Sequence, residues 1–96
     1  MTDVTSTRTI LNPQSGLKEV ILKSGTTVVG GTDTLTMDLS NFGITSILGV
    51  HGFVHTTDGS IIVAEDGTTA VASDTLTYTT VVGNDNCRRV VIVYGV

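Results

Sequence analysis

The chain has 96 residues, a formal net charge of −4, and 15% charged residues. This length predicts one domain with a modest core, because a chain of this size buries only roughly 60–65% of its unfolded surface. Nucleic-acid binding is disfavoured, since phosphate contacts need Lys and Arg; the chain has five of these residues, and none lies between Ser24 and Cys87.

Composition also argues against secretion and membrane insertion. A single cysteine, Cys87, excludes an internal disulfide, so synthesis in a reducing cytoplasm is expected. The first residues, MTDVTSTRT, lack the apolar core of a signal peptide, and no apolar run approaches the roughly 18 residues of a membrane helix. Threonine, valine and glycine dominate, which is typical of an all-β protein.

The first 15 residues predict an extended N-terminal arm. Their apolar residues alternate only loosely with serine and threonine, and Asn12-Pro13 breaks the pattern. Such an arm can lie on a neighbouring molecule, where its main chain adds a strand to the neighbour's sheet. We therefore expect an arm over residues 1–15 and a single β domain over residues 16–96.

Strand segments separated by turn signals follow the arm. Residues 17–23 predict a first strand, and residues 32–39 alternate apolar and polar side chains with the period of a strand. A short helical turn is expected next, with Ser40 or Asn41 as its cap and Gly43 at its end.

A hairpin is predicted in the middle of the chain. Residues 45–56 and Ile61 to Glu65 are strand candidates, and Asp58-Gly59 between them is a turn signal, because this pair readily adopts positive φ angles. Asp66-Gly67 repeats the signal and predicts a second turn of the same kind.

The last third of the chain continues the pattern. Residues 69–72 and 75–82 are strand candidates that break near Ser73-Asp74, and residues 83–86 are a polar loop. Residues 88–96 end the chain with an apolar run typical of a strand buried on both faces. About six to eight short strands without a helical period predict a small antiparallel β-sandwich or barrel.

The strand edges predict self-assembly. Soluble β-proteins guard open edges with lysine or proline, but this chain has one proline and no lysine after Lys23. We therefore expect edges that are covered by other chains, in a homo-oligomer.

His51 and His55, the two histidines, lie four residues apart, as in helical zinc sites. Gly49 and Gly52 favour a strand instead, in which the two Cα atoms are about 13 Å apart. Two ligands of one zinc ion have nitrogens within about 4 Å of each other, so this pair does not share a metal. We expect His51, Phe53 and His55 to line one face, at a sheet margin or a subunit interface.

No other residues predict a catalytic, metal or cofactor site. The Asp-Gly and Asn-Asp-Asn sequences lack the spacing of a calcium loop and are explained as turns. Cys87 precedes two arginines, but no nearby histidine offers a base. We expect no enzymatic activity, no catalytic or metal-binding residue, and no cofactor.

Three stretches of the chain resemble small proteins encoded among the head genes of tailed bacteriophages. They are TSTRTILNPQSGLKEVI at residues 5–21, LSNFGITSILGVHGFVHTTDGSIIVAEDGTTAV at residues 39–71, and RRVVIVYGV at residues 88–96. Together they cover more than half of the chain. The family that they resemble is that of the head decoration, or capsid cement, proteins.

The resemblance implies a β-rich protein that assembles as trimers or dimers on the outside of the capsid. There it would contact the major capsid protein and reinforce the shell against the pressure of the packaged DNA. It would be made in the host cytoplasm, reside in the virion, and have no nucleic-acid or membrane partner. The expected contact residues are Arg8, Ile10 and Leu11 in the arm, and Arg88 and Arg89 at the start of the last strand.

The residues leave two other classes of function open. One is a tail or fibre module that binds a host-surface receptor or glycan, although few aromatic side chains are present to stack against sugars. The other is a small hydrolase or metal enzyme, which stoichiometric zinc would support.

Overall fold

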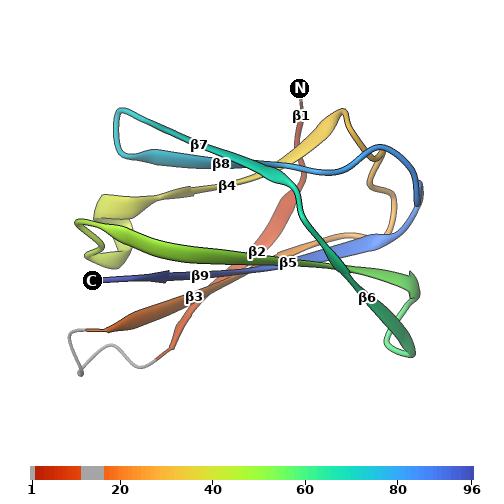
Figure 1. The fold of residues 1–96 in the computed structure, drawn as a ribbon, viewed down its shortest axis with the longest axis horizontal. Helices are drawn as coiled ribbons and strands as arrows, with labels where there is room; N and C mark the ends of the chain where they lie inside the picture. Colours follow the sequence, from red (N-terminus) through yellow and green to blue (C-terminus); the bar gives the residue numbers. More distant parts are fainter. Residues whose placement is uncertain (1, 12–16) are drawn as a thin grey trace.

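Two stacked β-sheets make up the chain in a computed structural model that describes residues 2–11 and 17–96 (Figure 1). One sheet has the strand order β1-β4-β8-β7 and the other the order β2-β3-β9-β5-β6. Only the short pair β1–β4 is parallel among the described strand pairs. The predicted all-β class is thus confirmed, as a sandwich. The elements are β1 Thr2–Asp3, β2 Thr5–Leu11, β3 Lys18–Ser24, β4 Asp33–Asp38, η1 Leu39–Phe42, β5 Ile47–Thr57, β6 Ile61–Glu65, β7 Thr68–Ala72, β8 Thr75–Thr79 and β9 Arg88–Gly95.

The inner faces of the two sheets form the core. Strand alternation places every second side chain of β3, β4, β8 and β9 between the layers, where full burial of one aliphatic side chain is worth about 1.5–3 kcal/mol. The side chains of the core cluster are Val20, Leu22, Leu35, Met37, Leu39, Ile44, Leu76, Tyr78, Val91 and Val93.

Residues 2–11 are extended, as predicted, but they belong to the sandwich. β2 pairs with β3 from Thr5 opposite Ser24 to Leu11 opposite Glu19, while β1 pairs with β4 of the other sheet. Ile10 packs against the core, so burial and backbone pairing both hold this segment on its own domain. The expectation of a separate arm is corrected here, while residues 12–15 and the expected boundary at residue 16 lie outside the described residues.

Two connections between the sheets take only one or two residues, and each joins an edge strand of one sheet to an edge strand of the other. At Val4 the chain leaves β1 and enters β2, and at Asp66-Gly67 it leaves β6 and enters β7 (Figure 1). The predicted second hairpin turn at Asp66-Gly67 is therefore wrong. Glycine is needed at this crossing because a Cβ on Gly67 would overlap the ring of Tyr78.

The other predicted turns are present. Gly59 has φ 71°, and the Ser60 amide donates to the Thr57 carbonyl at 2.9 Å, which closes the β5–β6 hairpin. Ser73 and Asp74 have φ angles of 50° and 65° between β7 and β8, as two-residue hairpin loops require.

The helical turn η1 begins earlier than predicted. Its N-cap is Asp38 rather than Ser40 or Asn41, because the turn starts at Leu39, whose side chain is buried in the core. Gly43 ends it with φ 67°, as predicted.

β9 lies in the middle of the five-stranded sheet, between β3 and β5. Its residues alternate between buried and half-buried, with Arg89, Val91 and Val93 on the inner face. The sequence predicts that this strand is buried on both faces, but only the side chains on the inner face of β9 are fully buried. The outer side chains stay half-buried because no other described segment covers them.

Candidate interaction surfaces

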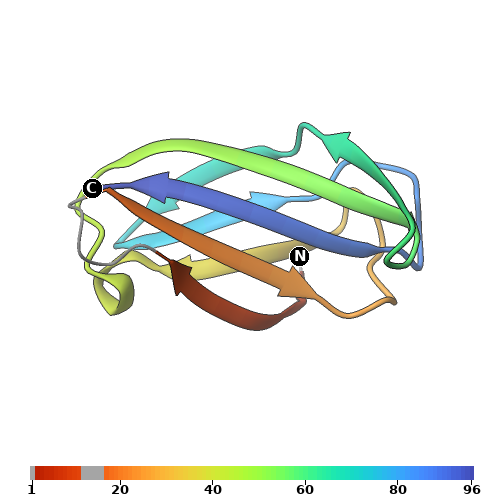
Figure 2. The same ribbon diagram turned by 90° about the horizontal axis from the view of Figure 1, so that it is seen from below.

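The outer face of the five-stranded sheet carries the three residues predicted for a subunit interface. His51, Phe53 and His55 alternate along β5 with side chains that point inward, so they point away from the core. The His51 and Phe53 rings stack with centroids 6.3 Å apart, and His51 meets Tyr94 of β9 edge-on at 5.8 Å. Figure 2 views the molecule from this side, with β3, β9 and β5 in front.

The outer faces of the two sheets differ in their chemistry. On the four-stranded sheet, most outward-pointing side chains are threonine or alanine. Thr36 of β4 and Thr77 of β8, for example, lie opposite each other. An outer sheet face is usually polar, so the five-stranded sheet is the unusual one. Its outer side chains include five apolar or aromatic residues from β3, β9 and β5, which we call the apolar sheet face: Ile21, Phe53, Val90, Ile92 and Tyr94.

Arg88 lies at one end of the apolar sheet face. Its Nε donates to Asp58 Oδ1 at 2.9 Å, and its Nη1 donates to the Ser24 carbonyl at 2.7 Å. The bond from Arg88 holds the pKa of Asp58 below its ordinary value. His55 Nδ1 accepts a bond from the Gly59 amide at 3.2 Å. Because the Arg88 side chain is 22% exposed, this predicted contact residue stays within reach of a partner.

Arg89 is not accessible to a partner, which corrects its predicted role as a contact residue. Its side chain is 0% exposed and lies between the sheets. Nε donates to Glu65 Oε2 at 3.0 Å, while the two Nη atoms donate to the carbonyl oxygens of Gly83, Asn84 and Cys87. The strand period explains the difference, because successive residues of β9 point to opposite faces.

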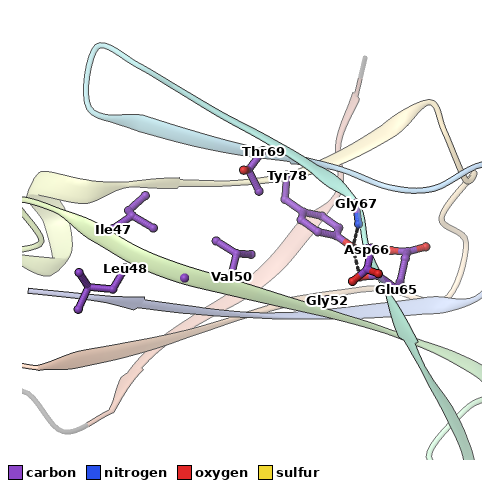
Figure 3. Close-up of a pocket in the computed structure, with 10 residues that line it drawn as sticks. Ile47, Leu48, Val50, Gly52, Glu65, Asp66, Gly67, Thr69 and Tyr78 are labelled. Atoms are coloured by element: carbon purple, nitrogen blue, oxygen red, sulfur yellow. Dashed lines mark hydrogen bonds between the residues drawn. The ribbon is translucent and has the colours of Figure 1, made fainter.

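Arg89, Glu65 and Tyr78 form a bonded cluster inside the sandwich, of which Figure 3 draws Glu65 and Tyr78. The Tyr78 hydroxyl donates to Glu65 Oε1 at 2.8 Å and accepts from the Gly67 amide at 3.2 Å. Burial, followed by the bond to the Glu65 carboxylate, raises the pKa of Tyr78 far above its ordinary value of 10.0. Among the described residues, no buried side-chain nitrogen or oxygen atom lacks a hydrogen-bond partner.

A cleft of about 290 Å³ lies next to this cluster, between β5 and the β6–β7 crossing (Figure 3). Its polar wall is Glu65, Asp66 and Tyr78, and its apolar wall includes Ile47 and Val50. Glu65 and Tyr78 of this wall are bonded to each other, with the Tyr78 hydroxyl 2.8 Å from Glu65 Oε1.

The N-terminal contact residues are placed on the side of the sandwich. Arg8 donates from Nε to the Thr36 carbonyl at 2.9 Å and forms an ion pair with Asp3 at 3.3 Å. Ile10 packs against the core, and Leu11 is 39% exposed. Arg8 and Ile10 thus hold β1 and β2 to the sandwich, and Leu11 is the most accessible apolar residue of the segment.

A second apolar surface surrounds β6, and it was not predicted from the sequence. Ile61, Ile62 and Val63 are 55%, 53% and 47% exposed. Val63 borders a groove that also contains Val54, Val81 and Val82, which we call the valine groove. The sequence predicts β6 as one strand of a hairpin but not that the other sheet leaves it uncovered. The sequence feature that could have indicated this apolar surface is the adjacent pair Val81 and Val82, which lies in a loop.

In the part of the chain that the structure describes, no three His, Cys, Asp or Glu side chains gather closely enough to hold a metal ion. No helix within residues 2–11 and 17–96 is long and apolar enough to cross a membrane. Comparison of the chain with protein-family models, with curated proteins and with solved structures gave no match.

Proposed function

We propose that this chain is a structural protein that decorates the outside of a tailed-bacteriophage head and stabilises it by protein–protein contacts with the major capsid protein. The proposal starts from the resemblance of residues 5–21, 39–71 and 88–96 to head decoration proteins. A β-sandwich whose five-stranded sheet carries apolar and aromatic side chains on its outer face, beside Glu19, Lys23 and Arg88, is a suitable module for this task, because this face can contact another protein.

The observation that carries the proposal is the contrast between the two outer faces. Threonine and alanine cover the four-stranded sheet, whereas the apolar sheet face carries the stacked rings of His51 and Phe53 beside Tyr94. Aromatic side chains are enriched at protein interfaces, because they supply a large contact area at a low entropy cost. We therefore assign the apolar sheet face to the capsid contact.

The bonded interior supports a non-catalytic role. The buried ionisable side chains Glu65, Tyr78 and Arg89 bond to one another, and buried Asp33 accepts a bond from the Val29 amide, so these groups connect parts of the fold. Asp3, Arg8, Asp58 and Arg88 are likewise engaged in ion pairs within the chain. These internal bonds favour a function in which the protein binds other proteins through its surface.

The test is co-sedimentation with purified heads that lack this protein. We expect saturable binding by the wild-type chain and at least tenfold weaker binding by Phe53→Lys, which puts a charge into the centre of the apolar sheet face. The matched control is Thr77→Lys, at a half-buried position on the outer face of the other sheet, which should bind as wild type does. Equal binding by both variants, or no wild-type binding, would reject the proposal.

A further inference from the structure

β6 is an open edge of the five-stranded sheet. It pairs with β5 from Gly52 opposite Glu65 to Thr57 opposite Ile61, and no described strand pairs with its other side. Its backbone groups on that side are therefore available to another strand.

The side chains of β6 are exposed on both faces of the sheet. Ile62 points to the outer face with its pairing partner His55, while Ile61 and Val63 point to the inner face. The four-stranded sheet does not cover this inner face, because the chain leaves β6 at Asp66 and crosses over to β7 (Figure 1). The valine groove of about 250 Å³ lies there, and Val82 beside it is 84% exposed.

β6 also lacks the lysine and proline residues that protect many edge strands. No lysine, arginine or proline occurs from Thr56 to Ala64, and the one charged residue, Asp58, is held by Arg88 in the turn before the strand. An unprotected apolar edge of this kind pairs with another strand. β7, an edge strand of the four-stranded sheet, has one exposed large apolar residue, Val71, against three in β6.

We propose that β6 pairs with β6 of a second copy of this chain, in an antiparallel dimer whose two five-stranded sheets become one continuous sheet. A two-fold axis perpendicular to the sheet keeps the outer faces of the two copies on the same side of the joined sheet. Two residues that lie opposite each other across the axis must therefore both point inward or both point outward. Centring the axis on Ile62 places Ile62 opposite its own copy. Ile61 then lies opposite Val63 of the second chain.

Self-pairing fits the chemistry of β6 better than pairing with a different strand. The centre of the contact is isoleucine and valine from both chains. This register places Asp58 of one chain opposite Asp66 of the other, but both lie outside β6, in the hairpin turn and in the crossing to β7. The two valine grooves fall on the same side of the joined sheet and meet next to the axis. Because each chain uses its one β6 edge, the contact is closed at two copies. The dimer is independent of any capsid contact, since the apolar sheet face of each copy stays free.

The first test is the solution mass of the full chain by sedimentation equilibrium. We expect twice the chain mass of 10.0 kDa, and the monomer mass for Ile62→Lys. Val71→Lys is the matched control, since Val71 is 55% exposed on the edge strand β7, and this variant should remain a dimer. Circular dichroism should show folded β structure in both variants. A monomeric wild type, open-ended aggregates, or a dimer that Ile62→Lys leaves intact would overturn the proposal.

The second test examines the register of the pairing. In a Cys87→Ser background, Ile62→Cys should form an intermolecular disulfide on mild oxidation, because directly opposed residues have Cα atoms about 4.5–5.5 Å apart. Val71→Cys in the same background should crosslink at least tenfold more slowly. Equal crosslinking rates for the two variants would rule out pairing centred on Ile62.

Discussion

Arg89 on the central strand β9 and Glu65 at the end of β6 meet inside the sandwich, with Nε and Oε2 3.0 Å apart and both side chains almost completely buried. This ion pair joins the middle of the five-stranded sheet to the point where the chain crosses to the other sheet. Arg89 also binds three carbonyl oxygens of the 83–87 loop. One side chain therefore holds a sheet, a crossing and a loop together.

Removing Arg89 should destabilise the fold more than neutralising its partner. Arg89→Met leaves Glu65 Oε2 and three carbonyl oxygens without the donors that Arg89 supplies, so we expect the free energy of unfolding to fall by about 3–5 kcal/mol. Glu65→Gln keeps a polar group of the same shape, so we expect it to lower the free energy of unfolding by only about 1–3 kcal/mol. Urea denaturation measures both, and a smaller loss for Arg89→Met than for Glu65→Gln would contradict the assigned contacts.

Tyr78 should stay protonated at a pH where an ordinary tyrosine is ionised. Its pKa is raised above 10.0 in the folded chain, so the native state keeps a proton that the unfolded chain loses. The stabilising effect is complete below pH 10 and falls as the pH rises further. In a Tyr94→Phe variant, where Tyr78 is the remaining tyrosine, absorbance at 295 nm should rise only when the protein unfolds.

A titration of Tyr78 near pH 10 in the folded Tyr94→Phe variant would refute this interpretation. Tyr78→Phe offers an independent check, because it removes the acceptor of the Gly67 amide and one donor to Glu65. We expect this variant to lose about 1–3 kcal/mol in the free energy of unfolding.

Gly52 should not tolerate a side chain. A Cβ at this position would overlap the Tyr78 hydroxyl and lie 2.6 Å from the Glu65 carbonyl oxygen, so Gly52→Ala must displace the buried cluster. We expect Gly52→Ala to lower the free energy of unfolding by about 3 kcal/mol. Gly25→Ala is the control, since no atom lies within 4 Å of its Cβ position, and it should melt as wild type does.

Acid should loosen the N-terminal strand before the rest of the sandwich. Partial burial acts to raise the pKa of Asp3, but bonds from the Thr5 amide and the Thr36 hydroxyl outweigh it and hold the pKa below 3.8. The contribution of Asp3 is therefore present above about pH 4 and is lost as the pH falls through the lowered pKa. Hydrogen exchange at the Val4 amide, which donates to the Thr34 carbonyl, should speed up first.

Asp3→Asn should show this faster exchange at neutral pH and lose its dependence on acid. Equal exchange at Val4 in the wild type and in Asp3→Asn would contradict the role of Asp3 in holding β1 to β4.

The alternation of apolar and polar residues with a period of two made much of the fold predictable. The alternation of residues 32–39 and 75–82 correctly indicated two strands, although β8 ends at Thr79 rather than at residue 82, and Asp58-Gly59 correctly indicated a hairpin. The same period already puts Arg89 in phase with Val91 and Val93, although two adjacent arginines suggest a surface site. Its partner Glu65 lies 24 residues away, and no local pattern specifies a contact at that separation.

The two Asp-Gly pairs show the limit of what a local sequence pattern predicts. Asp58-Gly59 is a turn, whereas Asp66-Gly67 crosses between the sheets and needs glycine because the Tyr78 ring is adjacent. This requirement comes from another strand rather than from the local backbone. Likewise, exposure of β6 depends on where the four-stranded sheet ends, which is a property of the complete sandwich.

If a bacteriophage genome encodes the chain, as the proposed function requires, cryo-electron microscopy of its virion is the most direct test. We predict density for the sandwich on the capsid exterior, with the apolar sheet face that contains Phe53 and Tyr94 against the major capsid protein. Absence of the chain from the particle, a location at the tail tip, or contact through the threonine-covered sheet would contradict the proposal.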